Sequence, residues 1–411
     1  MGSADVGRCG GGLRRAILRF GLAGALALAA HGCGGEPAEA PGVGAEQAGA
    51  PVVDAEQAKR LDALGYLDYA AAPDAQDADG LVLRDAARSW PGYNLITYPV
   101  LRRAEVFDAE GRVLRVWQDE TGTSKRWERA RLLPGGELLV VRRPSGILRL
   151  DAGGRVLWES DVRAHHDAVP LPDGRIATLT SRRRELPGIG PVWDNGVALL
   201  APDGAVQEER SLVDMLATRP DLLPLVTSGI GSAQDEPLDL LHANYLEWIL
   251  REPAAGGDPR FRPGTLLVTL RHQDALALFD WASGSLLWAW GRGELLRPHD
   301  GQLLENGHVL VFDNRSGEEW SRIVELDPRS GRIVWQYRGA EPSDFYSKSR
   351  GAVQRLPNGN TLIAASNAGR AFEVTPEGEL VWEYLTPRNE QGRRPTFRLE
   401  RYEPAMLEPR P

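Results

Sequence analysis

Short runs of alternating apolar and polar residues recur along most of the chain, and tight turns that contain glycine separate them. Alternation with a period of two indicates β-strands with one buried face, and such turns join neighbouring strands into hairpins. One recurring segment places a glycine turn before a strand that carries tryptophan: DAEGRVLRVW, DAGGRVLWES, DPRSGRIVWQY and TPEGELVWEY. The other is a hairpin between two apolar strands: LLPGGELLVV, PLPDGRIATL, LLENGHVLVF and RLPNGNTLIA. The pattern predicts an all-β protein built from repeated units.

The spacing of the tryptophans indicates the architecture. Trp117 and Trp158 are 41 residues apart, and Trp288, Trp335 and Trp382 follow one another at intervals of 47. A period of about 40–50 residues with four short strands per unit is typical of a β-propeller. We expect a six-bladed β-propeller with four-stranded blades at about residues 90–120, 126–160, 165–212, 240–292, 299–338 and 347–387. A β-sandwich with regular turns is the alternative, but it does not account for the repeated glycine turn and tryptophan.

Two segments do not follow the repeat. Residues 211–236 (SLVDMLATRPDLLPLVTSGIGSAQDE) lie between the third and fourth blades, and their pattern predicts a short helical insertion. The segment FRLERYEP at 397–404 follows the last blade, and it offers a strand that would close the ring against the first blade.

The N-terminal part has a different composition from the repeats. Four arginines between positions 8 and 19 precede an apolar stretch at 20–30, and Cys33 follows. This layout predicts a lipoprotein-type signal peptide over residues 1–32 with lipidation at Cys33, and cleavage by an ordinary signal peptidase is the alternative. Residues 33–85 are expected to form a flexible tether with a short helix at 54–64, before a propeller at 86–405. We expect an exported protein, periplasmic or held on the outer membrane through its lipid.

Composition narrows the range of functions. The chain of 411 residues has a formal net charge of −9 and no basic cluster beyond its N-terminus, which argues against nucleic acid as a partner. Its two cysteines are Cys9, within the predicted signal peptide, and Cys33, so no disulfide is expected in the mature protein. No nucleotide-binding glycine motif is found in the sequence, and we expect no cofactor.

One position of the repeat carries histidine in some blades and not in others. The residue five positions before the leucine of the hairpin turn is, in successive matching blades, Glu128, His166, His299 and Gly351, and the equivalent strand of the fourth blade begins at His242. A residue that the fold requires would occur in every blade. Because the innermost strands of a propeller line its central channel, we expect the three histidines to converge on one site.

Strand alternation adds two residues to this set. Asn244 lies two positions after His242 and therefore on the same face, whereas Arg271 and His272 are adjacent, so that only one of them can face the channel. By the same argument the register selects His166 over His165. The histidines that we assign to structural roles are His31, His272 and His308.

The resulting set consists of three imidazoles, an amide and a guanidinium. Three histidines could bind zinc or copper, but an arginine at the same centre would repel a cation, so we expect no metal. Arginine, histidine and asparagine together donate hydrogen bonds in the directions that a tetrahedral oxyanion accepts. A neutral histidine beside such an anion can act as a nucleophile or as an acid or base.

The motifs HHDAVPLPDG, LHANYLEW, LLVTLRHQDALALFDWASGSLLWAWG and PHDGQLLENGHVLVFDN resemble those of the bacterial arylsulfotransferases, which are exported six-bladed propellers. The resemblance extends from about residue 86 to the C-terminus. It implies that His299 is a nucleophile that becomes sulfated, and that His166, His242, Asn244 and Arg271 hold the sulfuryl oxygens. It also implies transfer from an aryl sulfate ester to a phenol, without a nucleotide donor.

Two other functions are compatible with a propeller. A non-catalytic propeller that binds a periplasmic or cell-surface partner would need only the fold and would not require the histidines. A quinone-dependent dehydrogenase shares the tryptophan-rich repeats, but such enzymes usually have eight blades and a carboxylate calcium site, and the sequence indicates neither.

Overall fold

The computed structural model describes residues 78–119, 125–143, 146–230, 236–389 and 392–408. Internal contacts divide the chain into two units, residues 1–52 and 53–411, and every described residue belongs to the second. The expected signal peptide, the lipidation site Cys33 and the helix at 54–64 lie outside the described residues. Among the described helices, none has the length and apolar character needed to cross a membrane.

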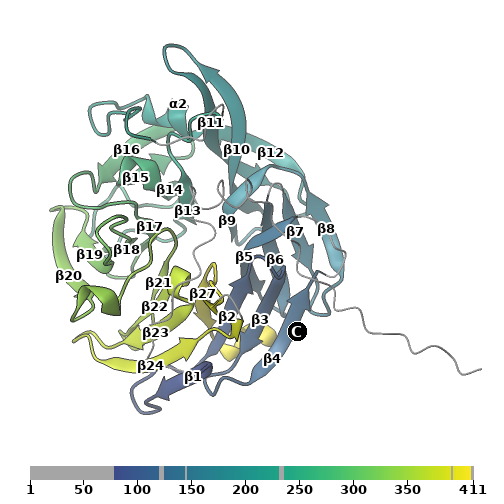
Figure 1. Cartoon of the computed structure of the whole chain (residues 1–411). Helices are drawn as coiled ribbons and strands as arrows, with labels where there is room; N and C mark the ends of the chain where they lie inside the picture. The colour runs from purple at the N-terminus through teal and green to yellow at the C-terminus, as the bar shows by residue number, and fades with distance from the viewer. Residues whose placement is uncertain (1–77, 120–124, 144–145, 231–235, 390–391, 409–411) are drawn as a thin grey trace, which may run out of the picture. The chain divides into compact units, whose positions relative to one another are not determined.

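Six antiparallel sheets are arranged around a centre as the blades of a propeller (Figure 1), which confirms the predicted architecture. From the innermost strand outward, the first three blades are β27 (Leu399–Tyr402), β2 (Tyr93–Tyr98), β3 (Arg103–Phe107) and β4 (Val113–Gln118); β5 (Arg126–Leu133), β6 (Glu137–Arg143), β7 (Ile147–Leu150) and β8 (Val156–Ser160); and β9 (Ala164–Pro170), β10 (Ile176–Leu186), β11 (Gly190–Leu200) and β12 (Val206–Ser211).

The other three blades have the same order. They are β13 (Ala243–Trp248), β14 (Thr265–Leu270), β15 (Ala275–Asp280) and β16 (Ser285–Trp290); β17 (His299–Leu303), β18 (Val309–Asp313), β19 (Arg322–Asp327) and β20 (Arg332–Arg338); and β21 (Ala352–Arg355), β22 (Thr361–Ala365), β23 (Arg370–Val374) and β24 (Leu380–Leu385). Outside the blades lie a small hairpin and four short 3-10 helices: β25 (Arg388–Asn389) with β26 (Gly392–Arg393), η1 (Arg271–Gln273), η2 (Pro342–Asp344), η3 (Ser366–Ala368) and η4 (Pro404–Leu407).

The two ends of the described chain both join blades far from them in sequence. The closing strand expected within 397–404 is β27, which pairs with β2 as the innermost strand of blade 1. β1 (Gly80–Arg84) pairs with β24 as a fifth, outermost strand of blade 6. The sequence analysis placed residues 80–84 in the tether, because a five-residue edge strand has too little alternation to stand out.

The insertion between blades 3 and 4 contains less helix than expected. Its one α-helix among the described residues is α2 (Leu212–Leu216), which begins where the Ser211 hydroxyl accepts a hydrogen bond from the backbone N–H of Asp214. After it the described residues form turns and irregular chain. Pro220 limits the helix, because it lacks the backbone N–H that would donate to the carbonyl of Leu216 in a continuing helix.

The repeated tryptophan connects each of several blades to the next one. Four indole N–H groups on the fourth strands of their blades donate to backbone carbonyls in or beside the glycine turn of the following blade: Trp117 to Asp151 (3.3 Å), Trp290 to Gly331 (3.1 Å), Trp335 to Pro376 (2.7 Å) and Trp382 to Ala109 (3.4 Å). Trp158 packs its ring against Gly204, where a Cβ would come within 2.7 Å of the indole. The coupled repetition of glycine and tryptophan therefore reflects contacts between blades.

A ring of side-chain acceptors holds the innermost strands together, although these strands belong to different sheets. In five cases a side chain on one inner strand accepts a hydrogen bond from a backbone N–H of the next: Glu128 from His166 (2.7 Å), Asp167 from Leu246 (3.1 Å), Glu247 from Leu303 (2.7 Å), Asp300 from Val353 (2.6 Å) and Gln354 from Arg401 (2.9 Å). We call these five residues the acceptor ring. Because buried charged acceptors make strong bonds, the ring fixes how the starts of the strands face one another.

Candidate active site

All five site residues expected from the sequence line one cavity at the centre of the propeller. His166, His242 and His299 lie at the starts of the inner strands β9, β13 and β17 or directly before them, Asn244 is on β13, and Arg271 begins η1. Each of the three histidine side chains is at least nine-tenths buried. The topology thus brings together residues that are up to 133 positions apart in the sequence.

Irregular backbone, rather than regular alternation, directs two of the histidines. His166 has φ +57° and His242 has φ +45°, in the left-handed region that non-glycine residues rarely adopt. The pairing register of β9 shifts at the same place, between the partners of Thr178 and Thr180. Such local strain is held in place by surrounding contacts and is frequent at functional sites.

These irregularities correct two steps of the sequence analysis. His165 and His166 do not point in opposite directions, because their Nδ1 atoms lie 2.7 Å apart. Arg271 and His272 are not on a strand either, and Arg271 Nη1 is 2.7 Å from His272 Nε2. The two residues that alternation set aside, His165 and His272, therefore contact the residues that it selected.

His299 is fixed by a neutral partner. Its Nδ1 lies 2.6 Å from Oδ1 of Asn314, and the Asn314 amide donates to the backbone carbonyls of Ser347 (2.6 Å) and Arg350 (2.7 Å). Because both amide hydrogens are used there, the amide oxygen faces the imidazole and accepts a hydrogen bond from Nδ1–H. The lone pair on Nε2 is then available to a ligand. Burial, together with the charge of Arg271, lowers the pKa of His299 to about 3, which keeps the ring neutral.

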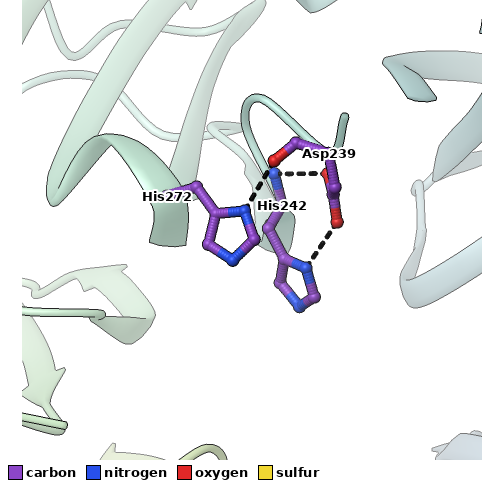
Figure 2. Close-up of side chains that lie close together, drawn as sticks. All are labelled: Asp239, His242 and His272. Atoms are coloured by element: carbon purple, nitrogen blue, oxygen red, sulfur yellow. Dashed lines mark hydrogen bonds and ion pairs between the residues drawn. The ribbon is translucent and has the colours of Figure 1, made fainter. Parts of the chain in front are cut away.

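His242 is fixed by a carboxylate (Figure 2). Its Nδ1 lies 2.6 Å from Oδ2 of Asp239, and its backbone N–H donates to Oδ1 of the same side chain at 3.0 Å. Burial lowers the pKa of His242 to about 3, and the negative charge of Asp239 opposes that shift. In this pair too, Nδ1–H is the donor and Nε2 is the nitrogen left for a ligand.

His166 completes the set in the same tautomer. His165 Nε2 must donate to the carbonyl oxygen of Thr180, 2.9 Å away, so its Nδ1 accepts from Nδ1–H of His166. Burial lowers the pKa of His166 well below its usual value. The His166 and His242 rings are 5.0 Å apart, so two of the three available Nε2 atoms belong to neighbouring rings.

The cavity carries more positive than negative charge. Its lining contains four arginines, Arg129, Arg271, Arg350 and Arg398, but one carboxylate, Asp300. Arg129 and Arg398 also form buried ion pairs with Glu400, and both guanidinium groups lie 5.5 Å from the ring of Tyr245. Such a lining favours a buried anion over a cation.

A family model for arylsulfotransferases (ASST) matches residues 130–387. The chain belongs to the arylsulfotransferase family. No curated protein matches it. Solved structures with a similar fold include a protein of unknown function from Bacteroides caccae, at 16% identity over 72% of this chain and 93% of that one, with a TM-score of 0.48. Another is the virginiamycin B lyase of Staphylococcus aureus, at 12% identity over 77% and 87% of the two chains, with a TM-score of 0.44.

In this member of the family, part of the cavity lies outside the matched segment. Phe397 and Arg398 line the cavity from the residues that lead into β27, and the rings of Phe397 and His166 are 6.1 Å apart. They directly precede the closing strand β27, so ring closure also completes the site.

A metal ion fits this set of residues poorly. Among the described residues, one group of three His, Cys, Asp or Glu side chains has ligand atoms within 4.8 Å of one another, and it consists of Asp239, His242 and His272. Three of its four ring nitrogens are engaged already: His242 Nδ1 with the Asp239 carboxylate, and both nitrogens of His272 with the Asp239 carbonyl and the Arg271 guanidinium. The three cavity histidines do not form such a group, and this wider spacing suits an oxyanion.

The sequence analysis missed the residues that support the site. Asp239 and Asn314 each hold a histidine, but neither was selected, because neither occupies the repeat position of the histidines. Two signals point to them in retrospect: Asp239 lies three residues before His242, and Asn314 directly follows β18, which pairs with the strand of His299. Asn244 lines the cavity, and its Nδ2 donates one of its two hydrogens to the carbonyl of Pro298 at 2.9 Å.

Proposed function

We propose that the protein transfers a sulfuryl group from an aryl sulfate ester to a phenol through a sulfohistidine at His299, without a nucleotide donor. The family assignment supports sulfotransfer in general. The observation that carries the finer proposal is the state of His299: a buried neutral imidazole whose Nδ1–H is held by Asn314, which leaves the Nε2 lone pair for attack.

Each half-reaction follows from the groups around His299. In the first, Nε2 of His299 forms a bond to sulfur while the bond between sulfur and the aryl oxygen breaks, and its electron pair goes to the departing phenolate. Arg271 and Arg350 line the same cavity and balance the negative charge of the sulfuryl oxygens. In the second, a phenol oxygen attacks the sulfur and the N–S bond returns its electron pair to Nε2, and the proton that this phenol loses balances the one that the departed phenolate gains. One site used twice therefore serves both donor and acceptor.

The proposal predicts a two-step reaction that depends on His299. Purified protein given 4-nitrophenyl sulfate and phenol should release nitrophenol, and varying both substrates should give parallel double-reciprocal lines. After donor alone, mass spectrometry should find about 80 added mass units, those of a sulfuryl group, on the peptide containing His299. His299→Ala should lose the adduct and at least ~10³-fold of the turnover.

His308→Ala is the matched control. His308 is in the turn before β18, outside the cavity, and its ring bonds to Glu325 on β19. It should keep the wild-type rate. Transfer at an undiminished rate by His299→Ala would contradict the mechanism, and a wild-type protein without any transfer would favour a non-catalytic binding propeller.

A further inference from the structure

We infer that Asp239 positions two groups of the active site at once, His242 and Arg271, and that its carboxylate makes His242 the residue that carries a proton to and from the aryl oxygen. The inference rests on the proposed function, because it assigns roles within the same site. Asp239 is a positioning residue: it does not line the cavity, and it acts through its neighbours.

Three separate contacts of Asp239 carry the geometric part of the inference (Figure 2). One carboxylate oxygen accepts from His242 Nδ1 (2.6 Å), the other from the His242 backbone N–H (3.0 Å), and the Asp239 carbonyl accepts from His272 Nδ1 (2.6 Å). The first two fix the ring in the left-handed backbone from which it reaches the cavity. The third fixes His272, whose role the sequence analysis gave as structural.

His272 transmits this positioning to Arg271. With Nδ1–H bonded to Asp239, Nε2 of His272 carries a lone pair and accepts from Nη1 of Arg271, 2.7 Å away. The rings of His272 and His242 are also only 4.7 Å apart. Asp239, His272 and Arg271 therefore form a continuous chain of hydrogen bonds that ends at a guanidinium lining the cavity.

The charge of Asp239 separates His242 from His299. The titratable and charged groups around His242 are Asp239 before β13, Arg271 and His272 on η1, and His166 on β9, and of these Asp239 is the negative one. A sulfate ester offers only acceptor oxygens, so an imidazole must hold a proton on Nε2 to donate to it. With an anion bound on one side and a carboxylate on the other, His242 is better placed than His299 to take up that proton.

The proton completes the first half-reaction. Nε2–H of protonated His242 gives its proton to the aryl oxygen as the bond between that oxygen and sulfur breaks, and a neutral phenol departs. His299 then carries the sulfuryl group and His242 is neutral. In the second half-reaction the attacking phenol returns a proton to Nε2 of His242 while the N–S bond breaks. Protons and charge balance over the full cycle.

A series of donors with different leaving groups tests this role. Nitrophenolate is a weak base that departs unaided, whereas phenolate, with a conjugate acid of pKa about 10 as in tyrosine, needs the proton. Asp239→Asn should therefore lose less than ~10-fold in kcat with 4-nitrophenyl sulfate but about 10²–10⁴-fold with phenyl sulfate. Asparagine matches the shape of aspartate, and the backbone of Leu238 pairs with Pro191 and Trp193 independently of the side chain, so the loop should keep its fold.

Asp258→Asn is the control, because Asp258 is a buried carboxylate paired with Arg260 and remote from the cavity lining. It should leave both donors unchanged. An equal loss with both donors in Asp239→Asn would overturn the proton role and reduce Asp239 to a structural residue. Failure of the proposed function itself would look different, since the wild-type protein would then use neither donor.

His272→Phe tests the link to Arg271 separately. Phenylalanine keeps a ring beside His242 but cannot accept from the guanidinium or donate to the Asp239 carbonyl. The KM for the donor should rise about 10-fold through loss of one positioned cation, while the ratio of rates for the two donors stays at its wild-type value. An unchanged KM would overturn the part of the inference that concerns Arg271.

Discussion

His242 and His299 lie at comparable positions in their blades, but they differ in the group that accepts a hydrogen bond from Nδ1. Both begin inner strands of adjacent blades, both are buried, and burial lowers the pKa of each to about 3. A carboxylate accepts from Nδ1 of His242, whereas a neutral amide accepts from Nδ1 of His299. Burial therefore keeps both rings neutral in the absence of a ligand. The group that accepts from Nδ1, a carboxylate for His242 and an amide for His299, decides which ring can gain a proton when an anion binds.

The charge of Arg271 acts on both histidines, and of the three changes considered next its replacement should have the largest effect. Its charge contributes to the lowered pKa of both rings. Arg271→Lys keeps that charge but loses the planar pair of donors, so turnover should fall by roughly 10–1000-fold. Arg262→Lys, which alters an arginine paired with Asp280 outside the cavity, should keep the wild-type rate. Unchanged turnover in Arg271→Lys would place its guanidinium outside the reaction.

Asn314→Asp should remove the difference between the two histidines. A carboxylate behind His299 raises its pKa, and a protonated Nε2 cannot attack sulfur. At pH 6 the rate should fall about 10–100-fold and recover as the pH rises, because proton loss restores the nucleophile. In the wild type the pKa of His299 is about 3, so protonation of His299 should cause no loss of rate above pH ~4. A pH–rate profile parallel to that of the wild type would contradict the distinction drawn here.

The smallest effect concerns stability in acid, where the two histidines should behave alike. Their folded pKa values lie below the unfolded value near 6.5, so the unfolded chain binds more protons as the pH falls below 6.5. As the pH falls from roughly 6 to 4, each histidine should therefore lower the free energy of unfolding by about 1.4 kcal/mol for every pH unit. Urea unfolding of His242→Gln and His299→Gln should show flatter pH dependence than the wild type. Equal slopes would mean that these rings gain protons without unfolding.

The sequence predicts the propeller and the cavity because both depend on patterns that repeat. Trp117 and Gly331 each belong to a contact between a tryptophan and a glycine turn that recurs from blade to blade. The spacing of these repeated residues along the chain therefore gives the number of blades. The supporting residues do not repeat. Asn314 is 15 positions from His299, and the ion pair of Asp300 with Arg398 spans 98 positions, so no repeated pattern marks these residues.

Strand alternation failed at the site for a related reason. A left-handed residue such as His166 interrupts the alternation, so the side chains of His165 and His166 contact each other instead of pointing to opposite faces. The pattern that locates a strand therefore cannot say where its irregular residues point. The short edge strand β1 was missed because it contributes one extra strand to a blade that the repeat already completes.

Closure of the ring by β27 determines when, during folding, the cavity of the active site becomes complete. β27 pairs with β2 across about 300 residues of intervening chain, and the residues that lead into it, Phe397 and Arg398, form part of the cavity wall. Contacts of such long sequence separation form late in folding, because a large loop must close before they bring any gain. During synthesis a ribosome-bound chain can complete several blades while its cavity still lacks one wall. Sulfuryl transfer would thus begin only after β27 has docked and closed the ring.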